Sequence, residues 1–517
     1  MTAQPNSDIY ILSGVPLDND YNHTLFFNTA AAQAQTMDGY AKYKLTKQSY
    51  QRQNLGEIRV GYTTDELFDC NYIMFRNTAY GDKWFYAFIT ELEYKNESMT
   101  IIHFELDVIQ TWFFDVAPGK CFVEREHSAT DGLFFNTVPE NVDLGNEYII
   151  NPTTTTTKMS GSNYLLLATE NSDGTKATPA IINGVFCPLY AFQSKFEASI
   201  TAKINAYVNA GRENSILAIY QIPDYVSIYT TSSGTDYDPG ASTTDFRVIP
   251  NTTTIDGYIP RNKKLFSYPY NFISVSNATG QTAEIKWELW PTADDRGKFL
   301  LEGVGVSTPA IMCSPKNYRG ATVDRESGLV LNVFPQCPWV GDTFKAWWAQ
   351  NRASTITSGI TTAISAGAGI AANVATGNVS GAVGGAVNLL GGIASTVARV
   401  QDIKNAPSQA HGQTQTDSLN AALQRVGFLF NTLSVRAETA RIIDDFFDRF
   451  GYATHRTKVP NRAVRPHWCY TKTQGCILEG GSIPQNDAKK IMQIYDNGIT
   501  FWKNPAEVGN YSLDNSV

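Results

Sequence analysis

The carboxylates best suited to chemistry stand in two pairs on consecutive apolar stretches. Glu91 and Glu93 lie in KWFYAFITELEY, and Glu105 and Asp107 lie in MTIIHFELDVIQTWFF. Residues two apart on a strand share one face, so each pair can converge on a sugar as acid and nucleophile or base. Carboxylates on the wet face of a sheet are more often solvated or ion-paired. A cell-wall glycan hydrolase is therefore kept only as an alternative function.

Other catalytic and metal-binding signatures are lacking in the sequence. The six histidines are isolated, no H-E-x-x-H or P-loop motif occurs, and the seven cysteines are scattered without a C-x-x-C pair. We therefore predict a protein that is not an enzyme, without cofactor or metal, whose cysteines are free buried thiols. The net charge of −8 argues against a dedicated nucleic-acid binder, yet it suits a surface along which DNA passes without sticking.

The elements that must position these residues are mainly strands up to about residue 340. The runs 83–94 and 99–114 are rich in β-branched and aromatic residues, and the polar link KNES between them predicts a hairpin. The stretch 197–211 predicts a helix ended by a glycine. A helical pattern starts at 341–352, and RAETARIIDDFFDRFGY predicts another helix. The predicted apolar face of that last helix holds Ile442, Ile443, Phe446, Phe447 and Phe450. After residue 455 we expect strands and turns.

This order predicts an α+β fold that is mainly β, a multidomain subunit with a helical, hydrophobic insert. We expect a β-rich domain at 1–150, a looser β-rich region at 151–340, a helical stem with an uncharged loop at 341–415, and an α+β domain at 416–517. Charged residues make up 17% and aromatic residues 12% of the chain, a composition that suggests large buried interfaces. The chain is therefore expected to assemble as an oligomer.

The segment from Ala353 to Ala398 contains 46 residues without Asp, Glu, Lys, Arg or His. A Gly-Asn turn signal divides it into two arms of about 22 residues, each roughly 33 Å long as a helix, against a hydrocarbon core of about 30 Å. The glycines of the second arm form a double G-x-x-x-G pattern, which lets helices approach closely in an apolar medium. The residues that we assign to a membrane-active loop are Ile356, Ile360, Ile364, Gly367, Gly377, Val379, Gly381, Val383, Gly385, Val387, Leu389 and Leu390.

The apolar content of this segment limits what it can do in a membrane. Its twelve Ile, Val and Leu residues supply only about 4–7 kcal/mol towards insertion, and its nine Gly, three Asn and eleven Ser or Thr residues oppose it. The segment is therefore too weak for a permanent anchor, and several copies are needed for insertion. A buried helical pair and a small-residue linker are the alternatives that the residues alone leave open.

Basic residues gather between Asp448 and Glu479, where no acid occurs. Because aromatic residues are interspersed among them, this stretch can touch DNA phosphates. Pairing with acids of the N-terminal sheet or of a neighbouring subunit is the alternative. The candidates for DNA or subunit contacts are Arg456, Lys458, Arg462 and Arg465.

Several stretches of the chain resemble one protein family. NYIMFRNTAYGDKWFYAFITELEYKNESMTIIHFELDVIQTWFFDV, at 71–116, closely resembles the tail knob, or distal tail tube, proteins of phi29-like short-tailed bacteriophages. The resemblance resumes in CFVEREH at 121–127, LGNEY at 144–148, KLFSYPYNF at 264–272 and DNGITFWKNPAEVGNYSLDN at 496–515. The region 151–340 resembles the family only in patches and is shorter.

The resemblance implies a hexameric tube at the tail tip of the virion, with a wall built from N- and C-terminal parts. It also implies hydrophobic loops that plug the tube and later open a path through the host membrane for DNA, and the uncharged segment lies where the family places that loop. Implied partners are other copies of the chain, a proximal tail tube or lower collar protein, double-stranded DNA without sequence specificity, and the host membrane. Host cell-wall components are a further candidate.

The expected location follows from the same resemblance. The chain is expected to be made in the host cytoplasm, because its N-terminus lacks the basic and apolar regions of a signal peptide. It is then expected at the virion tail tip, where it contacts the host envelope during infection. A host-surface binding protein, with 151–340 as the adhesive region, is the second alternative function.

Overall fold

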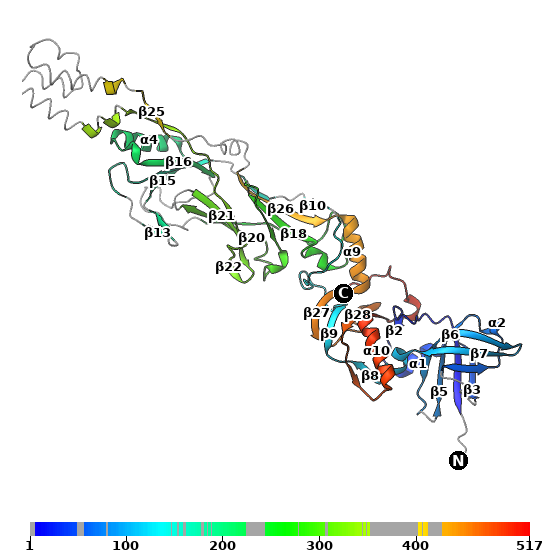
Figure 1. Ribbon diagram of the computed structural model, residues 1–517. Helices are drawn as coiled ribbons and strands as arrows, with labels where there is room; N and C mark the ends of the chain where they lie inside the picture. Colours follow the sequence, from blue (N-terminus) through cyan, green and yellow to red (C-terminus); the bar gives the residue numbers. More distant parts are fainter. Residues whose placement is uncertain are drawn as a thin grey trace, which may run out of the picture. The chain divides into compact units, whose positions relative to one another are not determined.

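The computed structural model describes residues 6–48, 56–78, 81–145, 147–151, 155–158, 162–176, 180–182, 185–187, 189–223, 243–277, 279–305, 309–343, 345–347, 349–351, 402–405, 407–411 and 426–517. It confirms an α+β fold that is mainly β (Figure 1). The chain divides into two compact units. Unit 1 comprises Met1–Ile149, Asn251–Asn271 and Ser434–Val517, and unit 2 comprises Ile150–Pro250 and Phe272–Leu433. The division into four consecutive domains stays a prediction.

Unit 1 begins with a six-stranded antiparallel sheet of order β3-β1-β5-β6-β7-β4. Its strands are β1 (Ser7–Ser13), β3 (Ala41–Gln48), β4 (Glu57–Val60), β5 (Cys70–Asn77), β6 (Phe85–Asn96) and β7 (Met99–Leu106), with helices α1 (Ala30–Asp38) and α2 (Thr64–Leu67) between them. The predicted hairpin is confirmed, because β6 and β7 pair from Ala87↔Leu106 to Asn96↔Met99.

The prediction of a strand through residue 114 is wrong. The strand ends at Leu106, and Val108–Trp112 form helix α3. The side chain of Asp107 accepts a hydrogen bond from the backbone N–H of Gln110 at 3.0 Å and so caps this helix. Asp107, which fits the alternation of a strand in the sequence, is therefore the N-cap of helix α3.

The second sheet of unit 1 has the order β2-β30-β28-β9-β27. Its strands are β2 (Thr24–Leu25), β9 (Cys121–Glu126), β27 (Tyr452–Lys458), β28 (Trp468–Gln474) and β30 (Ile499–Trp502), and β8 (Val116–Pro118) pairs separately with β29 (Leu478–Gly480). Helix α10 (Gln485–Asn497) corrects the expectation of only strands and turns after residue 455. Its buried Ile491, Ile494 and Tyr495 recur at helical spacing, which a search for alternation overlooks.

One hydrophobic core joins the two sheets of unit 1. Tyr72 and Phe88 of the first sheet belong to the same cluster of buried residues as Trp468 and Trp502 of the second. A separate cluster, which includes Ile11 and Ile102, belongs to the six-stranded sheet alone. Residues from both ends of the chain therefore form a single folded body.

Helix α9 (Ala437–Phe450) confirms the predicted helix and packs within unit 1 on residues 255–270, which include the short 3-10 helix η3 (Lys263–Phe266). Ile443 and Phe447 are fully buried there. Ile442, predicted on the same face, is 71% exposed. Successive helix residues point about 100° apart, and the partner segment covers only the stripe that contains Ile443 and Phe447.

Unit 2 contains two five-stranded sheets, one of order β10-β26-β18-β19 with β11 on β26, and one of order β17-β20-β21-β22 with β23 on β21. A three-stranded sheet, β15-β12-β16, lies beside the predicted helix α4 (Glu197–Asn209), which is confirmed. The strands are β10 (Tyr148–Ile150), β11 (Thr155–Lys158), β12 (Ser162–Ala168), β13 (Ala180–Ile182), β14 (Val185–Cys187), β15 (Tyr190–Ser194), β16 (Ile216–Pro223), β17 (Thr243–Arg247), β18 (Asn271–Asn277), β19 (Thr282–Ile285), β20 (Lys298–Gly305), β21 (Pro309–Tyr318), β22 (Ala321–Val323), β23 (Leu329–Leu331), β24 (Trp339–Gly341), β25 (Gln409–His411) and β26 (Gly427–Val435).

Candidate functional site

Two strands that flank the uncharged segment, one before it and one after it, pair in unit 2. Strands β24 and β25 pair antiparallel in the register Trp339↔His411 and Gly341↔Gln409. The rings of Trp339 and His411 stack with centroids 4.4 Å apart and planes 14° apart. A Cβ on Gly341 would lie 3.3 Å from the His411 ring, so the stack favours a residue without a side chain there. We call this strand pair the base of the loop, because it places residues 409–411 beside residues 339–341.

The chain that leaves this base is helical, as predicted, at residues 343, 345–347 and 349–351. It is anchored on the end of helix α4, because the side-chain amide of Gln350 donates a hydrogen bond to the carbonyl oxygen of Gly211. Ala346 is buried at the same place, where its carbonyl oxygen would lie 2.7 Å from a Cβ on Gly211. Gly211 has φ +69°, a conformation that glycine adopts readily.

The predicted membrane-active residues lie outside the described residues. They are Ile356, Ile360, Ile364, Gly367, Gly377, Val379, Gly381, Val383, Gly385, Val387, Leu389 and Leu390. In the part of the chain that the structure describes, no helix is long and apolar enough to cross a membrane.

The sequence did not single out Trp339 or His411. No local pattern marks them, since Trp339 lies 14 residues before Ala353 and His411 lies 13 residues after Ala398.

Two of the four predicted basic residues, Lys458 and Arg465, have partners within unit 1, as does Lys472 of the same stretch. Lys458 forms an ion pair with Glu126 at 2.5 Å, and Lys472 forms one with Glu124 at 3.1 Å. Arg465 is 2% exposed and donates to the carbonyl oxygen of Asn515 at 3.2 Å. Lys458 and Lys472 thus pair with acids, as the alternative expected, but with acids of β9 in the second sheet rather than of the N-terminal sheet, and Arg465 contacts a backbone carbonyl.

Two of the predicted basic residues are more accessible. Arg456 on β27 is exposed. Arg462 is half-buried, with its guanidinium over the rings of Phe26 at 5.9 Å and Phe113 at 5.4 Å. Contact with DNA or another subunit stays a prediction for both.

The carboxylate pairs do not form open catalytic dyads. Glu93 accepts from His103 at 3.1 Å and from Lys95 at 3.2 Å, and these hydrogen bonds lower its pKa, whereas Glu91 is exposed. Glu105 pairs with Lys490, while Asp107 is fully buried. Glu93, Glu105 and Asp107 are therefore each engaged with different partners, and Glu91 faces solvent. Among the described residues no cluster of His, Cys, Asp and Glu could hold a metal ion.

The burial of Asp107 predicts a pH-dependent stability. Its side chain accepts from the Tyr72 hydroxyl at 2.9 Å and from the Gln110 N–H, yet burial raises its pKa to about 6 from 3.8. Between these pH values the folded chain holds a proton that the unfolded chain has lost, so unfolding becomes harder as pH falls from 7 to 4. For a shift of about two units the gain is of the order of 3 kcal/mol.

This pH effect is measured as a difference between two proteins. Urea unfolding of the natural chain and of Asp107→Asn is followed at pH 7 and pH 4, and the natural chain should gain stability relative to the variant at pH 4. A difference that is the same at both pH values contradicts the prediction.

A buried ionic cluster organises the middle of unit 1. Glu140 pairs with Arg125 and with Lys264, and its Oε1 accepts from the backbone N–H of Ala453 at 3.0 Å. The side chains of Glu140 and Lys264 are 2% and 1% exposed. Lys264 also donates to the carbonyl oxygen of Val138 at 2.8 Å. Three segments far apart in the sequence thus meet on one carboxylate.

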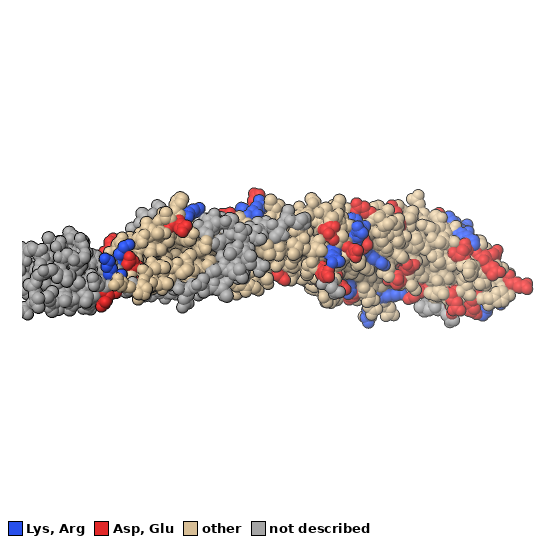
Figure 2. All heavy atoms as spheres, turned by 90° about the horizontal axis from the view of Figure 1, so that it is seen from above, with Lys and Arg blue, Asp and Glu red and all other residues tan. Residues whose placement is uncertain are grey.

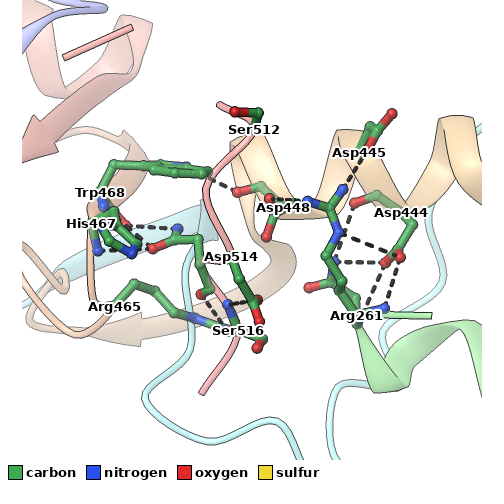
Figure 3. A network of polar contacts seen from close by, with 12 residues as sticks. Arg261, Asp444, Asp445, Asp448, Arg465, His467, Trp468, Ser512, Asp514 and Ser516 are labelled. Atoms are coloured by element: carbon green, nitrogen blue, oxygen red, sulfur yellow. Dashed lines mark hydrogen bonds and ion pairs between the residues drawn. The ribbon is translucent and has the colours of Figure 1, made fainter. Parts of the chain in front are cut away.

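A second polar network surrounds helix α9 (Figure 3). Arg261 reaches Asp444, Asp445 and Asp448, with Nη1 3.1 Å from the carboxylate of Asp448. Burial raises the pKa of Asp448 to about 6, although Arg261 lowers it. The network holds residues 258–262 on the helix.

The C-terminal residues lie beside this network in the same figure. Asn515 is fully buried, and its side-chain oxygen accepts from the N–H groups of His467 at 3.1 Å and Trp468 at 3.3 Å. Its amide donates to the carbonyl oxygen of Trp468 at 3.0 Å. The end of the chain is thereby joined to the start of β28 within unit 1.

Comparison with known proteins supplies the family. Residues 235–516 match the family model described as Bacillus phage phi29, tail knob protein gp9, C-terminal domain, and this match covers more than half of the chain. The chain belongs to the phi29 tail knob protein family. Residues 5–117 of this tail knob protein also match the model for the N-terminus of the caudoviral major tail protein.

Relatives and a solved structure agree with this assignment. The chain is 26% identical to tail knob protein gp9 of Bacillus phage PZA and of Bacillus phage phi29, with 99% of this chain and 98% of each relative covered. The structure of the bacteriophage C1 tail knob protein, gp12, superposes with a TM-score of 0.63 at 13% identity over 99% of both chains. That likeness supports the fold. A place in the virion tail follows from the family.

The motifs that carry the family resemblance supply the polar interior of unit 1 of this tail knob protein. CFVEREH contributes Arg125 to the Glu140 cluster. Both ring nitrogens of its His127, which is neutral, form hydrogen bonds. His127 accepts from the Tyr470 N–H at 2.7 Å and donates to the Asp448 carbonyl at 3.0 Å, while burial lowers its pKa to about 3. KLFSYPYNF contributes Lys264. These motifs therefore maintain the fold.

Proposed function

We propose that this tail knob protein is the subunit of a tube at the virion tail tip through which DNA leaves the particle. Six copies form the tube, and unit 1, where both ends of the chain share one core, builds its wall. The family membership and the match of residues 5–117 to a major tail protein support this proposal. The proposed role needs no enzymatic step, and this agrees with the hydrogen bonds that Glu93 and Asp107 form within the fold.

The uncharged segment 353–398 is proposed to plug the tube and then to penetrate the host membrane. The observation that supports this proposal is the pairing of β24 with β25, which joins the chain before the 46 uncharged residues to the chain after them. A loop fixed at one place can move as a unit, and several loops together can satisfy polar groups that one loop leaves unpaired.

The partners follow from this role. DNA passes without sequence recognition along a subunit whose net charge is −8, and phosphates are not held by a surplus of Lys and Arg. The proximal tail tube or lower collar protein adjoins the tube, and the host membrane and cell wall lie ahead of it. Synthesis takes place in the host cytoplasm, before assembly into the virion.

Deletion of 354–398 is expected to abolish membrane permeabilisation. The residues are replaced by a short Gly-Ser linker, which leaves the Trp339–His411 base intact, and release of a dye from liposomes is measured from pH 7 to pH 4. The natural chain should release dye, and the variant should release no more than protein-free liposomes do.

A second variant and an imaging control sharpen this experiment. Replacing Val379, Val383 and Val387 by Ser keeps the length but removes the apolar ridge, and it should also abolish leakage. Negative-stain images of both variants should still show six-fold rings. Undiminished leakage from the deletion variant rules out the membrane role, and absence of rings from the natural chain rules out the tube.

A further inference from the structure

Phe68 is the most exposed large apolar side chain among the described residues, at 85%. It follows helix α2 directly, between Leu67, which is fully buried, and Cys70, which is 6% exposed. Thr63 and Glu66 form a capping box at the start of this helix, with hydrogen bonds of 2.8 and 3.2 Å between the two residues. The phenyl ring of Phe68 is therefore held in solvent by a fixed turn. We name this turn, residues 63–68, the knob, and the word refers to the turn alone and not to the tail knob.

The surroundings of the knob are acidic. Figure 2 shows acidic side chains gathered over the N-terminal sheet, where Asp65 and Glu66 are exposed. Asp69 forms an ion pair with Lys42 at 2.6 Å. Within the part of the chain that the structure describes, Asp65 has no such cation, so its charge is available to another molecule.

Unit 1 also contains an open aromatic cleft of about 390 Å³. It lies between the chain that follows β2, the end of helix α3 and the β8–β29 pair. Its volume is near the lower end of the roughly 300–1,000 Å³ range of ligand pockets. Its lining includes Phe26, Phe27, Phe113, Phe114, Arg462 and Glu479.

The charged side chains that line the cleft are Arg462, Asp115 and Glu479. Arg462 lies over two phenyl rings of the lining, and among the described residues it forms no ion pair. Asp115 is paired with Lys83 at 2.5 Å. Glu479 forms no ion pair among the described residues, and Arg462 also hydrogen-bonds the Tyr495 side chain. The cleft therefore combines phenyl rings with a guanidinium and a carboxylate that have no ionic partner among the described residues.

We propose that the knob of one copy occupies this cleft on a second copy of the chain, with Asp65 beside Arg462. A phenyl ring is an apolar occupant for an aromatic wall, and aromatic side chains bury about 150–250 Å² each at interfaces. The acid next to the ring matches the cation in the wall. Phe68 is 85% exposed and does not line the cleft of its own chain, and Figure 1 shows helix α2 and strand β8 apart from each other within unit 1.

A contact between different surfaces of two copies runs head to tail, and it closes into a ring when the rotation between copies permits. The inference thus rests on the proposed tube and names one contact that holds its subunits together. Because knob and cleft both belong to unit 1, the contact forms in the part of the chain assigned to the wall.

The first test measures assembly of the full chain. Phe68→Ala should raise the protein concentration at half-assembly at least tenfold, as read by mass photometry and sedimentation. The matched control is Phe196→Ala, which removes another exposed ring, 72% exposed, from unit 2. It should assemble like the natural chain. Equal assembly of Phe68→Ala and the natural chain overturns the contact while the tube stands, whereas a natural chain that stays monomeric overturns both.

The second test examines the charge pair. Asp65→Arg and Arg462→Glu should each weaken assembly at least threefold, and the double variant should recover most of that loss. A double variant with the summed defects overturns the pairing of these two residues.

A photo-crosslink keeps the proposal testable where a variant folds poorly. A photoreactive phenylalanine analogue at position 68 should crosslink to peptides that contain residues 113–117 or Arg462. A mixture of isotopically light and heavy chains should show that these links join different chains. Crosslinks within one chain only, or to other peptides only, overturn the proposal.

Discussion

Replacement of Glu140 by Ala is expected to lower the free energy of unfolding of unit 1 by about 3–5 kcal/mol. The carboxylate is 2% exposed and lies between Lys264, which is 1% exposed, and Arg125, which is 16% exposed. Its removal leaves two cations together without a counter-charge and leaves the Ala453 N–H without its acceptor.

The matched control for Glu140 is a carboxylate in an exposed ion pair of the same unit. Glu147 pairs with Arg436, and their side chains are 62% and 55% exposed. Glu147→Ala should change stability by no more than about 1 kcal/mol. Urea unfolding followed by tryptophan fluorescence gives both values, and hydrogen exchange of peptides from α9 assigns the loss to unit 1. Equal effects of the two substitutions contradict the assigned role of Glu140.

The second large effect is expected for Asp444→Ala. Asp444 is fully buried and accepts from the Tyr258 hydroxyl at 2.7 Å. It also accepts from the backbone N–H groups of Arg261 at 2.8 Å and Asn262 at 3.0 Å. An unpaired buried donor costs about 1–3 kcal/mol, so we expect a loss of at least about 3 kcal/mol.

Asp445 provides a control on the same helix and the same arginine. It pairs with Arg261, but its side chain is 71% exposed. Asp445→Ala should therefore cost no more than about 1 kcal/mol. The two variants are compared by urea unfolding and by hydrogen exchange of residues 258–262. Similar losses for both would mean that the backbone hydrogen bonds of Asp444 contribute little.

Local patterns predicted the elements that depend on neighbouring residues. The hairpin of β6 and β7 follows from two apolar runs and a short polar link, and helix α9 follows from its spacing. The error at Val108–Trp112 has a local cause as well. Asp107 fits both the alternation of a strand and the start of a helix, and only its hydrogen bond to the Gln110 N–H decides between them.

The parts that the sequence did not predict depend on distant partners. Lys458 resembles a DNA-contacting residue until Glu126, far away in the chain, is placed beside it. The base formed by Trp339 and His411 likewise joins residues that no local pattern connects. The membrane role of 353–398 stays a prediction, and the pairing of the strands that flank the segment emerges only from the structure.

The core that contains Phe113 and Trp468 can form only late in the synthesis of the chain. These residues are 355 positions apart, and all of unit 2 lies between them in the chain. At roughly 5–20 residues per second, a ribosome needs roughly 20–70 s to extend the chain from Phe113 to Trp468. Throughout that interval the nascent chain presents an uncovered aromatic face. The core that joins the two sheets is therefore completed only after the chain through Trp468 has been made.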